Sequence, residues 1–230
     1  MKQQRAQKQN TADLLGQTPL FAGLPEDQLG VIAAIAVEKK LSRGETAFSE
    51  GDPGNGFYVV ASGTIKIYKV SSEGKEQILH IFGVGEPFGE VPVFSGQRFP
   101  ANAQAIAPSR LLFFPRDRFV ALVAKNPSLA LNMLAVLSMR LRQFTNQIEN
   151  LSLKEVPARL AAYLIYLSGE QESPKEVSLV ISKGQLASLL GTIPETLSRI
   201  FTKMTNQNLI RVRGRKIELI DRNALEELAE

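Results

Sequence analysis

The feature that most constrains the fold of this chain is a regular row of apolar residues between positions 134 and 151. Its members follow one another at steps of three and four residues: Leu134, Leu137, Leu141, Phe144, Ile148 and Leu151. Such steps keep the row on one face of an α-helix for almost three heptads, which favours a coiled coil between two chains. Packing of the helix against its own domain is the alternative. We predict a dimerisation helix over residues 125–152, with these six side chains at the dimer interface.

The chain before this helix has a different residue pattern. Short segments rich in β-branched and aromatic residues alternate with glycine-bearing turns, and the predicted strands are 57–61, 64–70, 77–82 and 111–114. Strands about ten residues apart, with turn residues between them, are typical of a small antiparallel β-roll or barrel. Two short helices, at 11–15 and 25–37, are predicted to precede the roll.

The chain after the long helix has the element order of a winged helix-turn-helix. Helical patterns cover about 155–168, 183–190 and 194–207, and Gly191 lies in the short turn between the last two. A polar loop is expected over 169–176. A hairpin at 209–220 turns at Gly214. Two helices joined by a short glycine-containing turn, followed by a hairpin, indicate this motif.

Positive charge is concentrated in the same region. The whole chain has a net charge of +4. Between Lys183 and Ile217, seven cations face a single anion, Glu195; the cations are Lys183, Arg199, Lys203, Arg211, Arg213, Arg215 and Lys216. A local excess of this kind is what a nucleic-acid backbone attracts. Double-stranded DNA is therefore the expected partner.

The second helix of the motif carries residues suited to reading bases. Glu195, Ser198 and Arg199 fall at i, i+3 and i+4 and share one face. Arginine can bond guanine in bidentate fashion, and glutamate can accept a hydrogen bond from cytosine. The alternative is a surface ion pair between Glu195 and Arg199. We predict base contacts by these three residues and phosphate contacts by Thr192, Thr196, Lys183, Lys203 and Arg213.

Composition excludes several classes of protein. The chain has no cysteine, so disulfides and cysteine-ligated iron–sulfur clusters are ruled out. It has one histidine, His80, whereas a cupin-like metal enzyme needs two or three with a carboxylate, so we do not expect an enzyme. No apolar run approaches the roughly 18 residues that span a bilayer, so no membrane association and a cytoplasmic location are expected.

These observations predict an α+β protein with four parts. Residues 1–11 form a disordered basic tail, 12–124 an N-terminal antiparallel β-roll that senses an effector, 125–152 the long dimerisation helix, and 153–230 a C-terminal winged helix-turn-helix that binds DNA.

A resemblance to a known family is carried by motifs along most of the chain. In the predicted helix-turn-helix they are residues 181–187 (ISKGQLA) and 191–200 (GTIPETLSRI), and in the roll they are 51–52, 56–58, 85–90 (GEPFGE) and 101–105 (ANAQA). These resemble the family that contains the cyclic AMP receptor protein and the fumarate and nitrate reduction regulator. The whole chain is most similar to its cysteine-free dissimilatory nitrate respiration regulator type. The resemblance implies a cyclic-nucleotide-binding-like jelly roll for the N-terminal part.

The resemblance also implies what the protein reads. Receptor-type members carry an arginine just before the glutamate, where this chain has Pro194. Glu195, Ser198 and Arg199 match the residues of the fumarate and nitrate reduction type. A TTGAT-N4-ATCAA-like palindrome is therefore expected, bound by a twofold dimer with half-sites roughly 34 Å apart. RNA polymerase is a further expected partner.

The effector is not fixed by the sequence. The resemblance places the effector pocket at Leu79, Gly89, Glu90, Phe99, Pro100 and Ala101. Members that bind cyclic nucleotides use a glutamate, matched by Glu90, and an Arg-Ser pair, where this chain has Phe99-Pro100. Arg98 is one residue early, and in a strand that turns its side chain to the other face. A cyclic phosphate would then be buried without a cation, which argues against cyclic AMP.

Haem sensing of nitric oxide or carbon monoxide, another small ligand and no ligand at all are the alternatives left open. His80 is the candidate haem ligand, although a lone strand histidine is more often structural. Met133, Met139, Tyr58 and Tyr68 are weaker candidates.

We therefore predict a homodimeric transcription regulator in which a small effector in the roll shifts the population of long-helix arrangements, through a hinge near 150–154. The competing hypothesis is a cyclic-nucleotide-binding regulatory protein without DNA function. That hypothesis explains Glu90 but leaves Arg199 and the hairpin without a role.

Overall fold

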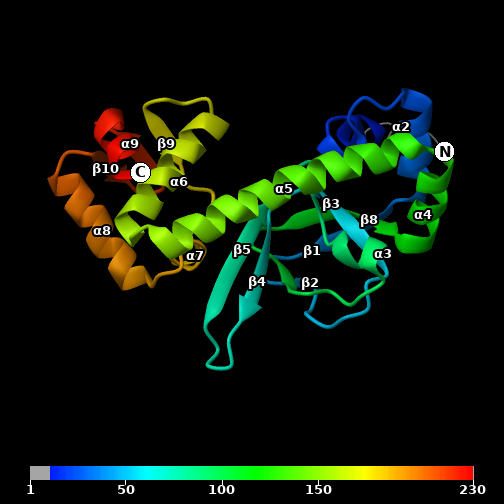
Figure 1. The fold of residues 1–230 in the computed structure, drawn as a ribbon, viewed down its shortest axis with the longest axis horizontal. Coiled ribbons are helices and arrows are strands. Elements are labelled where there is room, and N and C mark those ends of the chain that lie inside the picture. The colour runs from blue at the N-terminus through cyan, green and yellow to red at the C-terminus, as the bar shows by residue number, and fades with distance from the viewer. Residues whose placement is uncertain (1–10, 230) are drawn as a thin grey trace. The chain divides into compact units, whose positions relative to one another are not determined.

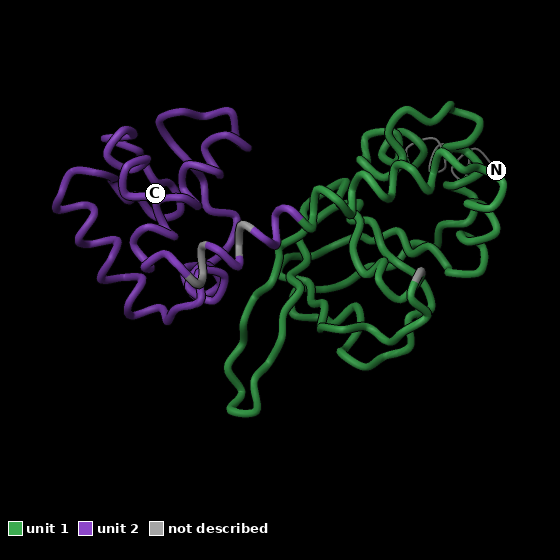
Figure 2. The backbone as a smooth tube through the Cα atoms, in the orientation of Figure 1, with its two compact units in different colours: residues 1–141 green, residues 142–230 purple. Residues whose placement is uncertain are grey.

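The computed structural model describes residues 11–229, apart from the side chains of residues 94, 146, 147 and 150–152. It divides into two compact units, residues 1–141 and 142–230, shown in Figure 2. The expected tail, residues 1–11, lies outside the described residues except for Thr11.

The first unit contains an antiparallel β-roll with helices before and after it (Figure 1). Residues 11–16 are helical. The elements that follow are η1 (Pro19–Phe21), α2 (Glu26–Ile35), β1 (Val37–Leu41), β2 (Thr46–Phe48), β3 (Gly56–Ser62), β4 (Ile65–Val70), β5 (Glu76–Phe82), β6 (Pro87–Phe88), α3 (Val91–Ser95), β7 (Asn102–Ala105), β8 (Ser109–Pro115), α4 (Arg116–Lys125) and α5 (Pro127–Leu153). The boundary between the two units falls inside α5.

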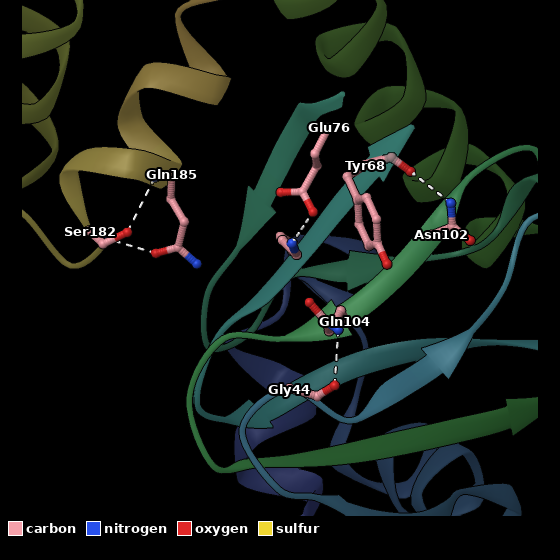
Figure 3. Close-up of polar contacts among 8 residues, drawn as sticks. Gly44, Tyr68, Glu76, Asn102, Gln104, Ser182 and Gln185 are labelled. Atoms are coloured by element: carbon pink, nitrogen blue, oxygen red, sulfur yellow. Dashed lines mark hydrogen bonds and ion pairs between the residues drawn. The ribbon is translucent and has the colours of Figure 1, made fainter. Parts of the chain in front are cut away.

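Two four-stranded sheets build the roll, in the orders β1-β8-β3-β6 and β2-β7-β4-β5. Every strand pair is antiparallel. Side-chain hydrogen bonds reinforce the second sheet, from Asn102 to the Tyr68 carbonyl and from Gln104 to the Gly44 carbonyl (Figure 3). The predicted α+β class and β-roll are confirmed.

β3 is buried along almost its whole length because each of its faces contacts a different core. Phe57 and Val59 pack with the helices, including Phe21 and Phe119. The alternating residues Tyr58 and Val60 face the second sheet. This explains why β3 is a continuous apolar run rather than an alternating one.

The second unit is a winged helix-turn-helix. After the last turns of α5 it contains α6 (Val156–Glu170), β9 (Glu176–Ser178), α7 (Lys183–Leu189), α8 (Pro194–Asn206), β10 (Ile210–Arg213), β11 (Lys216–Leu219) and α9 (Arg222–Ala229). Its sheet has the order β10-β11-β9. The predicted motif is confirmed.

Several local predictions need correction. The helix predicted over 25–37 ends at Ile35, because Ala36 has extended dihedral angles and Val37 begins β1. The loop predicted over 169–176 is shorter. α6 continues to Glu170, and Glu176 belongs to β9, where it pairs with Glu218 of the neighbouring strand. Strands β1, β2, β6, β7 and β9 and helices α3, α4 and α9 were not predicted.

Candidate nucleic-acid interface and effector site

The helix-turn-helix is built by local features of α7 and α8. Ser182 caps α7 in a reciprocal capping box: its hydroxyl accepts from the Gln185 amide, and the Gln185 side chain accepts from the Ser182 amide (Figure 3). Gly191 makes the turn with a φ of 68°, a conformation that costs glycine little. Pro194 starts α8 at a position where its missing N–H is harmless.

The N-cap of α8 is the apolar residue Ile193, which is 50% exposed and forms no side-chain cap. Its backbone is extended, as expected for a residue that precedes a proline. Pro194 therefore sets the N-cap conformation that a polar side chain usually stabilises.

One face of α8 is buried and the opposite face is exposed to solvent. The buried residues are Leu197, Ile200, Phe201 and Met204. The predicted base-reading residues Glu195, Ser198 and Arg199 are all exposed. Within the described part of the chain, no ion pair joins Glu195 to Arg199, so the alternative of a surface ion pair finds no support. The three polar groups are available to an external partner.

The predicted phosphate contacts lie around this helix. Lys183 is the first residue of α7, with its ammonium 5.2 Å from the centre of the Phe201 ring. Thr192 and Thr196 are half-buried at the turn and in the first turn of α8. Lys203 is exposed further along α8, and Arg213 ends β10.

The predicted effector pocket is largely filled by aromatic side chains. The ring of Phe99 stacks on Phe48 with centroids 3.7 Å apart. Gly89 has a φ of 73°, and a Cβ there would lie 3.0 Å from Phe48 and 3.2 Å from Phe99. Ala101 is also buried. The place expected for a cyclic phosphate is thus occupied by packed rings.

The carboxylate of Glu90 is bound by Arg140, which sequence reasoning missed as a partner. The guanidinium of Arg140 also donates to the Pro87 carbonyl and lies 4.9 Å from the centre of the Phe82 ring. The cavity beside the pair has a volume of about 10 Å³, room for about one water. Arg140 lies fifty residues from Glu90 in the sequence, on a different element.

The two remaining residues of the predicted effector pocket are Leu79 and Pro100. Leu79 is the extra residue of a β-bulge, since Ile67 pairs with His80 and Tyr68 with Ile78. Pro100 is exposed, and its carbonyl accepts a hydrogen bond from Lys69. Their assignment to an effector pocket stays a prediction.

Arg98 and Phe99 follow the alternation expected of extended backbone. The Arg98 guanidinium donates to the Gly51 carbonyl at 2.6 Å on the surface. Phe99 points inward and is 4% exposed. Arg98 therefore does not replace the missing phosphate-binding arginine.

His80 lies in a polar rather than a cofactor-like setting. Its Nε2 is 3.9 Å from Oε1 of Glu86, and its ring packs 4.4 Å from that of Phe82. Burial raises the pKa of Glu86, but hydrogen bonds from His80 and the Gly83 amide, with the charges of His80 and Arg140, bring that pKa below its usual value. His80 does not line the small cavity beside Glu90 and Arg140. The surroundings fit a hydrogen-bonded histidine better than a haem ligand.

Two apolar faces run along α5. Leu129, Met133 and Val136 are buried, the first two in the core of the first unit. The predicted interface residues form a separate row, in which Leu134, Leu141, Phe144 and Ile148 are 42–69% exposed and Leu137 is half-buried. The side chain of Leu151 lies outside the described residues. Core packing by the same chain therefore does not explain this row.

Over residues 11–229, no single helix has the length and apolar character needed to cross a membrane; only the bent pair 116–125 and 127–145, at 113° to each other, meets those criteria jointly.

Family models match both parts of the chain: a cyclic nucleotide-binding domain over residues 38–126 and a Crp-like helix-turn-helix domain over residues 158–228. The fumarate and nitrate reduction regulatory protein of Escherichia coli K12 is 32% identical over 207 residues, 88% of this chain and 82% of that protein. This chain belongs to the Crp/Fnr family of transcription regulators.

Two further proteins are similar to this chain over most of its length. The cyclic AMP receptor protein of Thermus thermophilus is 30% identical over 212 residues, covering 92% of this chain and 97% of that protein. The structure of FixK2 from Bradyrhizobium japonicum superposes with a TM-score of 0.77 at 24% identity, covering 85% of this chain and 98% of that one, which supports the fold. The Escherichia coli relative is by name a regulatory protein, a class that is typically not enzymatic. The chain is a DNA-binding regulator with an effector-binding type of domain.

Proposed function

We propose that this regulator works as a homodimer that reads a TTGAT-N4-ATCAA-like palindrome. The observation that carries the proposal is that Glu195, Ser198 and Arg199 are exposed on the first turns of α8, with no ion pair between their side chains and any other described residue. An N-terminal segment of a recognition helix meets base edges in the major groove. The pairing of arginine with guanine and of glutamate with cytosine supplies the discrimination.

The dimer is supported by the exposed apolar row on α5. Leu141 and Ile148 are 69% and 65% exposed, which is costly for a helix that remains alone in water. A second copy offers the same row, and a twofold dimer matches an inverted repeat. We propose RNA polymerase as the further partner through which DNA binding affects transcription.

Fluorescence anisotropy with the full chain tests this proposal. We expect tight binding to the palindrome, and a loss of about tenfold or more when the guanine of either half-site is changed. Equal affinity for scrambled DNA at the same salt concentration would contradict the proposal, since backbone contacts alone are independent of sequence.

For the effector, we propose a ligand other than a cyclic nucleotide. Phe99 stands where the family has the phosphate-binding arginine and stacks on Phe48, and the Glu90 carboxylate is already bound by Arg140. Calorimetric titration with cyclic AMP is expected to show no binding. Saturable binding that also raises DNA affinity would instead favour the cyclic-nucleotide hypothesis.

Haem ligation by His80 stays a hypothesis that one spectrum tests. The purified protein, reconstituted with haem, is compared with the variant His80→Gln before and after addition of nitric oxide. A stoichiometric Soret band that shifts in the variant would support haem sensing. Identical uptake by both proteins would assign His80 a structural role and direct the search to other ligands.

The proposed control is a population shift: an effector acts only if it binds one arrangement of the long helices more tightly than the other. Coupling is reciprocal, so DNA must change effector affinity by the same factor. Independent affinities for effector and DNA would contradict this mechanism.

A further inference from the structure

The turn of the β10–β11 hairpin concentrates positive charge. We define the wing tip as residues 213–216, which hold the three cations Arg213, Arg215 and Lys216 around Gly214. Arg213 lies directly opposite Lys216 in the ladder. Like charges at opposed positions destabilise a hairpin, so this arrangement is unfavourable for folding alone.

The ion pairs of the hairpin compensate only one of the three cations of the wing tip. Arg211 pairs with Glu218 at 2.9 Å, and Lys216 pairs with Glu176 at 2.7 Å. The side chains of Arg213 and Arg215 are exposed and have no ion pair or hydrogen bond to any other described residue. Two guanidinium groups at the tip are thus free for a ligand.

The backbone of the tip is held in place. Gly214 has a φ of 64° at the first position of a two-residue turn, where hairpins favour glycine. The Arg215 carbonyl accepts a hydrogen bond of 2.8 Å from the amide of Leu179, which is buried. A fixed backbone lowers the entropy lost when the arginines bind a partner.

Arginine on a narrow projection suits one feature of DNA in particular. The minor groove of A·T-rich sequence is narrow, and its enhanced negative potential attracts inserted arginine side chains. Arg215 lies in the turn itself, beyond the last ladder pair, whereas Arg213 ends the strand. Arg215 is therefore the arginine whose backbone lies closer to the end of the hairpin.

We infer that the wing tip binds the minor groove that flanks each half-site, with Arg215 in the groove and Arg213 on the phosphates beside it, so that A·T-rich flanks are preferred. This inference rests on the proposed reading of a half-site by α8. It assigns the wing a part in sequence selection through DNA shape, at positions that the recognition helix does not contact.

The test uses duplexes with identical half-sites and three kinds of flank: A·T pairs, G·C pairs and inosine·cytosine pairs. Inosine lacks the minor-groove amino group of guanine, so its pairs resemble A·T in that groove and G·C in the major groove. We expect the wild-type chain to bind A·T and inosine·cytosine flanks about fivefold tighter than G·C flanks, less than the cost of a mismatch within a half-site.

The variant Arg215→Ala is expected to reduce the flank preference to less than about twofold while it still discriminates between correct and altered half-sites. The matched control is Arg211→Ala, which removes the same charge from the base of the same hairpin and is expected to keep the preference. Thermal unfolding of all three proteins verifies that the wing is folded.

The outcomes separate the two proposals. Equal weakening by Arg215→Ala on all flanks would make Arg215 a phosphate contact and overturn the inference. Wild-type binding without flank preference, with half-site discrimination intact, would overturn it too and leave the proposed function standing. Loss of half-site discrimination in the wild type would contradict the proposed function itself.

Discussion

The guanidinium of Arg140 binds the carboxylate of Glu90 at a place where neither side chain is more than 14% exposed. Arg140 comes from α5, and Glu90 immediately precedes α3. The pair therefore fixes the long helix to the roll from within one unit. A ligand that used Glu90 would first have to displace Arg140, which also donates to the Pro87 carbonyl.

Arg140→Met is expected to lower the free energy of unfolding by about 3–5 kcal/mol, because Glu90 would remain buried without a partner. Urea denaturation followed by circular dichroism measures the change. The double variant Arg140→Met with Glu90→Gln removes the unpaired charge and is expected to recover most of the loss. A loss below about 1 kcal/mol in the single variant would show that Glu90 is solvated by other means.

Leu141→Glu is expected to give a monomer, because it places a charge without a partner in the proposed coiled-coil interface. Sedimentation equilibrium compares the mass with the 25.3 kDa of one chain. Met139→Glu is the matched control, since Met139 is 56% exposed on the opposite side of the same helix. If both variants kept the mass of a dimer, the apolar row would not be the interface.

Arg199→Ala is expected to weaken binding to the palindrome by about 10- to 100-fold, the range for losing one bidentate base contact. Arg199→Lys keeps the positive charge but not the planar guanidinium that makes two parallel hydrogen bonds, so we expect its affinity for the palindrome to stay close to that of Arg199→Ala. Lys203→Ala serves as the comparison: a phosphate contact is expected to weaken binding to all sequences equally and to reduce the salt dependence. Indistinguishable effects of the two alanine variants would argue against base reading by Arg199.

Ile193→Thr is expected to stabilise the second unit by about 0.5–1 kcal/mol, because threonine can cap α8 where isoleucine cannot. The backbone there is already extended, so the substitution needs no rearrangement. Thermal unfolding is compared with that of Ile193→Ala, which shortens the side chain without adding a cap. A threonine variant no more stable than the alanine variant would mean that the cap does not form.

Glu86 gives a pH-dependent prediction. Its lowered pKa means that the ionised carboxylate stabilises the fold above the usual value of 4.5, and that this stabilisation is lost as the pH falls through the lowered pKa. Glu86→Gln is therefore expected to be less stable than the wild type at about pH 7 and to approach it in acid. The side chain is 42% exposed, so the difference is expected to stay below about 1 kcal/mol. A stability difference between the two proteins that grew as the pH fell would contradict a lowered pKa of Glu86.

The sequence pattern sufficed for elements whose periodicity is strong. The apolar rows of α5 and α8 and the glycine turns of the roll were predicted within a few residues of their observed positions. Short elements escaped because they carry too few residues for a period: β6 has two residues and β9 has three. α9 had a detectable signal, since Asp221 caps it through the Ala224 amide and Arg222 pairs with Glu226 one turn later.

Some residues of the candidate site could be predicted from the sequence and others could not. Residues of the recognition helix are adjacent in sequence, so their shared face follows from helical spacing alone. The partner of Glu90 lies fifty residues away on another element, and only folding brings Arg140 to it. The bulge at Leu79 likewise changes a strand register that simple alternation would have continued.

The burial of β3 on both faces has a kinetic consequence. β3 contributes residues to both the helical core and the core between the sheets. Unfolding of β3 would therefore disrupt both cores at once. We expect the amide hydrogens of β3 and its neighbour β8 to exchange with deuterium only through unfolding of the whole roll. The roll would then lose structure as one cooperative foldon.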